Sequence, residues 1–87
     1  MILEIIGHGY EADERIKTLI NKKITRLNKI FDKDTRGKMT LKQEGSDCIM
    51  QITVFADTVI HAEAVSKNMY DNIDLLLPRI KKQIKKG

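Results

Sequence analysis

The chain has 87 residues and a net charge of +4, and its composition is 41% hydrophobic and 32% charged. This length predicts one domain, residues 1–87, and the hydrophobic fraction excludes a disordered protein. No apolar run reaches the roughly 18 residues that span a membrane, and Glu4 argues against a secretion signal, so we expect a cytoplasmic protein. Cys48 is the single cysteine and the two histidines lie far apart, so the sequence predicts no disulfide, metal site or cofactor.

The first half of the chain predicts a strand, a helix and a second strand. Residues 2–6 form a short apolar run that ends at a glycine-rich loop. Asp13 can cap a helix, because apolar residues recur after it at intervals of three and four as far as Phe31. Residues 38–43 then alternate polar and apolar side chains, which is typical of a half-buried strand.

The second half predicts a hairpin pair of strands. Residues 44–47 form a turn, and residues 48–56 carry apolar side chains at every even position, which indicates one buried face. Residues 57–58 can close a tight hairpin into another strand at residues 59–65.

A last helix follows, capped by Ser66 or Asn68, with apolar residues recurring from Met69 to Ile84. The element order β-α-β-β-β-α predicts an α+β fold, a two-layer sandwich with two helices on one face of a four-stranded sheet. A right-handed crossover and two hairpins make the helices roughly parallel, with their C-terminal ends at the same edge. Pro78 lies inside the last helix, and we expect it to kink the axis.

Basic residues are concentrated in the two predicted helices. Residues 15–29 contain six basic residues and no acid, and residues 67–87 contain six basic residues against Asp71 and Asp74. The helices therefore carry twelve basic and two acidic residues, a net +10, which leaves four basic and ten acidic residues elsewhere, a net −6. The charge is strongly polarised, and one face of the protein is predicted to be basic.

The basic residues gather in the C-terminal half of each helix. At about 100° per residue, Lys22, Arg26 and Lys29 fall on one flank of the first helix. The last helix repeats this arrangement at intervals of three and four, with Lys81 and Lys85 on its opposite flank. We expect a positive track two helices wide, whose natural ligand is a closely spaced array of phosphates. The predicted binding residues are Lys22, Lys23, Arg26, Lys29, Arg79, Lys82, Lys85 and Lys86.

Other interpretations of these residues remain open. Lysines near a helix C-terminus also complement the helix dipole, and a charged helix face is often only solvated. The outer face of the sheet, with Ile49, Phe55 and His61, could instead form a protein-interaction module. No group of residues suggests catalysis, so we predict neither an enzyme nor a small-molecule substrate.

Four segments of the sequence match known family motifs. Residues 23–32, KITRLNKIFD, are similar to K-L-x-K-L-x-R-x-F-D, and residues 82–86, KQIKK, to R-Q-L-K-K. Residues 60–64, IHAEA, are similar to I-H-A-x-A, and residues 68–74, NMYDNID, to D-M-Y-x-A-I-D. Together these segments resemble the ribosome hibernation promoting factor and protein Y family over essentially the whole chain.

The resemblance implies a fold like a double-stranded RNA-binding domain and a role in translation regulation. It implies binding to the small ribosomal subunit and its rRNA where tRNA and mRNA bind, which holds idle ribosomes inactive. Because the sequence ends at Gly87, we expect the short type, which pairs ribosomes with help from a separate ribosome modulation factor. The positions that match the family's basic contacts are Lys23, Arg26, Lys29, Arg79, Lys82 and Lys86.

Overall fold

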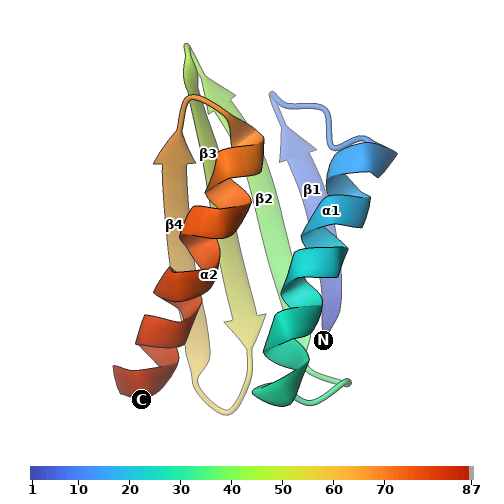
Figure 1. Cartoon of the computed structure of the whole chain (residues 1–87), viewed down its shortest axis with the longest axis vertical. Coiled ribbons are helices and arrows are strands. Elements are labelled where there is room, and N and C mark those ends of the chain that lie inside the picture. Colours follow the sequence, from blue (N-terminus) through green and yellow to red (C-terminus); the bar gives the residue numbers. More distant parts are fainter. Residues whose placement is uncertain (87) are drawn as a thin grey trace.

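The structure is a two-layer sandwich with a four-stranded sheet in one layer and two helices in the other (Figure 1). The computed structural model describes residues 1–86, except for the side chains of Asn28, Lys85 and Lys86. The predicted α+β class and element order are confirmed, with one short additional helix. The elements are β1 (Ile2–His8), α1 (Glu14–Ile24), the 3₁₀ helix η1 (Thr25–Lys29), β2 (Arg36–Glu44), β3 (Asp47–Phe55), β4 (Val59–Ser66) and α2 (Met69–Lys86).

The sheet has the order β1-β2-β3-β4, with β1 and β2 parallel and the two later pairs antiparallel. A parallel pair needs a crossover, which α1 supplies, and α2 follows β4 back along the same face. Both helices run in the same direction, and their C-terminal ends lie at the same end of the sandwich (Figure 1). The predicted parallel arrangement of the helices is therefore present.

The core lies between the sheet and the helices, and the strand alternation predicts it correctly. In β3 the even positions are buried, as in Met50 and Ile52, which are 0% and 1% exposed, whereas Phe55 is 54% exposed on the other face. Ile20 of α1 and Ile80 of α2 close the core from the helical side. Each such fully buried aliphatic side chain stabilises the fold by about 1.5–3 kcal/mol.

The first helix differs from the prediction at its C-terminal end. A single α-helix to Phe31 is wrong, because α1 ends at Ile24 and η1 continues as a tighter 3₁₀ turn. The Thr25 hydroxyl donates to the Lys22 carbonyl at 2.6 Å, an interaction that competes with regular helical geometry. A 3₁₀ helix turns about 120° per residue, so Lys29 is rotated by about 80° from its place on an α-helix.

The last helix is capped and continuous. The Asn68 side chain accepts a hydrogen bond from the Tyr70 amide at 2.9 Å, which confirms Asn68 as the cap. The helix continues through Pro78 to Lys86. Asn72 is fully buried and donates to the Cys48 carbonyl at 2.8 Å, which fastens α2 to the start of β3. Along the described residues, neither helix combines the length and the apolar character needed to cross a bilayer.

Candidate nucleic-acid interface

Two contacts define the flanks on which the helices face each other. The Lys23 ammonium lies 3.5 Å from an Asp74 carboxylate oxygen, and this ion pair connects α1 to α2. Near the other end of the helices, the Arg15 guanidinium lies over the Tyr70 ring, 5.9 Å from its centroid. Tyr70 and Asp74 therefore mark the side of α2 that faces α1.

A groove lies beside this ion pair, toward the C-terminal ends of the helices. It has a volume of about 260 Å³, and Leu77 and Pro78 supply apolar surface. Arg26 enters it from η1, and Asp74 and Lys81 enter it from α2. Arg26 and Lys81 are exposed and have no ion-pair or hydrogen-bond partner among the residues that the structure describes. Two unpaired cations in one groove are suited to binding phosphate groups.

Lys81 is the groove residue that the sequence prediction left out. The helical wheel placed Lys81 and Arg79 on opposite flanks of α2, and the structure has them on different sides. The wheel alone does not show which flank faces α1. In the structure, the flank of α2 that faces α1 is marked by residues at intervals of four, three and four. They are Tyr70, Asp74, Leu77 and Lys81.

Arg79 points away from the groove. Its Nη1 donates a hydrogen bond of 2.6 Å to the backbone carbonyl of Glu63 in β4. A guanidinium bonded to a carbonyl is held in one place, so the side chain fastens α2 to β4 and has less freedom to follow a ligand.

The remaining predicted residues are distributed around the groove. Lys22 and Lys82 are exposed, and the Lys23 side chain is 28% exposed because it is paired with Asp74. Lys29 lines a different hollow, beside Asp32 and Lys33, as its rotation in η1 requires. The side chains of Lys85 and Lys86 lie outside the described residues.

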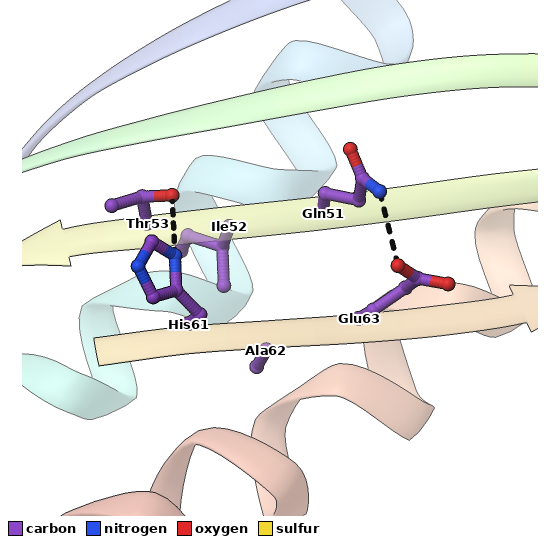
Figure 2. Close-up of a pocket in the computed structure, with 6 residues that line it drawn as sticks. All are labelled: Gln51, Ile52, Thr53, His61, Ala62 and Glu63. Atoms are coloured by element: carbon purple, nitrogen blue, oxygen red, sulfur yellow. Dashed lines mark hydrogen bonds between the residues drawn. The ribbon is translucent and has the colours of Figure 1, made fainter.

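The opposite face of the sheet carries polar residues that bind each other across the strands. Figure 2 shows Gln51 donating to the Glu63 carboxylate at 3.0 Å and Thr53 hydrogen-bonded to His61 at 3.1 Å. These four residues line a surface hollow of about 350 Å³. As predicted, His61 lies on this outer face, and its ring nitrogen is already engaged by a neighbour.

Within the part of the chain that the structure describes, no group of three His, Cys, Asp or Glu side chains is placed to hold a metal ion.

Comparisons with known proteins identify the family of the chain. Residues 3–87 match the model of a family described as Sigma 54 modulation protein / S30EA ribosomal protein. A ribosome hibernation promoting factor of Salmonella typhimurium is 29% identical over 97% of this chain and 90% of its own length. The protein of the same name from Escherichia coli is also 29% identical, over 99% of this chain and 92% of its own length.

Solved structures agree with these sequence matches. The Thermus thermophilus Protein Y N-terminal domain superposes with a TM-score of 0.87 at 25% identity, covering 99% of this chain and 98% of its own. A ribosomal subunit interface protein from Coxiella burnetii has a TM-score of 0.90, covering 99% and 96%, and at 24% identity it shows the shared fold. The resemblance inferred from the four sequence motifs is confirmed, and the chain belongs to the Sigma 54 modulation protein / S30EA ribosomal protein family.

Proposed function

We propose that the protein inhibits translation by binding the small ribosomal subunit with the face formed by α1, η1 and α2. The observation that carries this proposal is the groove between the parallel helices, where Arg26 and Lys81 lie together without a partner among the described residues. Curated relatives that match nearly the whole chain are named ribosome hibernation promoting factors, which supports a ribosomal target.

The mechanism is steric occupancy and involves no chemical step. Each cation that neutralises a phosphate releases condensed counterions, so affinity is high at low salt and nearly independent of RNA sequence. Once held in the region where tRNA and mRNA bind, the protein excludes both. A separate ribosome modulation factor pairs the silenced ribosomes. The protein acts in the cytoplasm.

The residues assigned to the RNA contact follow from the geometry of the helices. Lys29 and Arg79 lie at the margin of the interface, because one is rotated toward a loop and the other is bonded to β4. The central residues are Lys22, Lys23, Arg26, Lys81 and Lys82, and Lys85 and Lys86 continue the basic sequence of α2. About five phosphate contacts predict that log affinity falls with log salt with a slope of about −4.

The test is co-sedimentation with purified small subunits at a series of salt concentrations. The double variant Arg26→Glu, Lys82→Glu reverses two exposed cations of the helical face and should lower affinity by about 100-fold or more. The double variant Arg36→Glu, Lys38→Glu is its matched control, because it makes the same charge change on β2, whose even positions lie on the outer face. Equal losses in both variants, or normal sedimentation of the first, would contradict the proposal.

A second candidate function uses the outer face of the sheet to bind a protein. Phe55 and Val59 are partners across the hairpin and are 54% and 50% exposed, whereas Ile49, near the other end of β3, is half-buried. Such an interface would bind independently of salt and would survive nuclease treatment.

A further inference from the structure

The groove between the helices contains a hydrogen-bond acceptor that phosphate binding does not explain. The Asp74 side chain is 70% exposed, and among the described residues it contacts Lys23 in the 3.5 Å ion pair. That distance is too long for a strong hydrogen bond, so the carboxylate keeps its accepting capacity. A carboxylate repels phosphate, and therefore its presence in one groove with Arg26 and Lys81 favours a ligand that also donates a hydrogen bond.

We propose that this groove recognises the ribose of RNA. This inference rests on the RNA binding proposed above. The 2′-hydroxyl donates a hydrogen bond to the Asp74 carboxylate, and the phosphates beside it bind Arg26 and Lys81. Leu77 and Pro78 contact the apolar side of the sugar.

The 2′-hydroxyl fits better than the other donors of RNA. Every ribonucleotide carries one close to a phosphate, and in an A-form helix these hydroxyls line the wide, shallow minor groove. A base amine would also suit a carboxylate, but it would make binding depend on sequence. The ion pair with Lys23 links Asp74 to α1, the helix that leads into η1 and Arg26.

The experiment compares three hairpins of the same sequence: RNA, 2′-O-methyl RNA and DNA. Methylation removes the donor but keeps the base amines and the A-form helix. The wild-type protein should bind RNA about tenfold more tightly than the methylated hairpin, which is the effect of one hydrogen bond to a charged acceptor. Asp74→Ala should abolish this preference by weakening RNA binding, without weakening binding of the methylated hairpin.

Asp71→Ala is the matched control, because it removes the same charge from an exposed position of α2 that does not line the groove. It should keep the tenfold preference, and circular dichroism checks that both variants are folded. A preference that survives Asp74→Ala overturns the proposal. A loss of preference that varies with base sequence overturns it in favour of a base amine.

The outcome is separable from that of the proposed function. If wild-type protein sediments with small subunits but does not distinguish the hairpins, only the proposed recognition of the ribose is wrong. If it does not sediment with small subunits at low salt, the proposed function fails, whatever the hairpins show.

Discussion

The two faces of the sandwich carry similar kinds of residue and arrange them in opposite ways. On the helical face, Arg26 and Lys81 share a groove and lack partners within the described residues. On the outer face, Gln51 is hydrogen-bonded to Glu63 across the strands, as Thr53 is to His61. The difference shows that binding capacity depends on which polar groups are left unsatisfied, and that the number of charges alone does not reveal it.

The register of the sheet supports this contrast. Lys38 on β2 lies opposite Glu4 on β1, so a cation of the outer face has an acid beside it. On the helical face Asp74 is the acid in a groove with two cations, and a third cation, Lys23, lies next to it. Among the described residues, the groove of the helical face brings together two unpaired cations from two different elements.

The largest effect is expected from a substitution that loosens the helical layer from the sheet and so lowers the stability of the fold. Asn72→Ala removes the hydrogen bond to the Cys48 carbonyl and leaves a buried acceptor without its donor. We expect the free energy of unfolding to fall by about 2 kcal/mol and the Tm by about 10 °C, measured by thermal and urea denaturation. Asn21→Ala, at an exposed position of α1, should change stability by less than about 0.5 kcal/mol. Equal stability of the two variants would show that this contact does not hold α2 in place.

Two single substitutions, one on each flank of α2, should separate a residue that binds RNA from one that stabilises the fold. Lys81→Ala should weaken small-subunit binding by about five- to tenfold and reduce the magnitude of the salt slope by about 1. Arg79→Ala should leave the slope unchanged, because Arg79 is bonded to the Glu63 carbonyl, and lower stability by about 1 kcal/mol. Salt titrations and urea denaturation of both variants separate the two roles. A slope that falls as much with Arg79→Ala would place both flanks on the RNA.

The smallest change is expected on the outer face of the sheet. Phe55→Asp replaces a half-exposed ring by a charge and should alter small-subunit affinity by less than about twofold. Binding that Phe55→Asp abolishes, and that neither salt nor nuclease reduces, would instead assign the interaction to a protein partner of this face.

Much of the fold could be predicted from local patterns. The alternation in β3 predicted which of its residues are buried, and Gly45, with a φ of 60°, forms the turn expected between β2 and β3. The change from α1 to η1 could not be predicted, because Thr25 is not a helix breaker. The tight turn there accompanies the burial of Leu27 and Phe31, which depends on the sheet beneath them.

The candidate site was predicted less completely than the fold. Arg26 was selected by the helical spacing and Lys23 by the family resemblance, and both lie at or beside the groove. Lys81 was missed because a helical wheel gives angles within one helix and does not say which side faces another. The role of Asp74 as an acceptor could not be predicted for the same reason, because the Lys23 ammonium beside it comes from a different helix.

The hydrogen bond from Arg79 to Glu63 has a consequence for solubility. β4 is an edge strand, and edge strands expose backbone groups onto which another chain can add a strand and begin to polymerise. The guanidinium occupies one of these backbone acceptors and sets a charge beside it. A strand that added to β4 at this point would have to displace the contact and cover the charge, so the contact disfavours polymerisation through this edge.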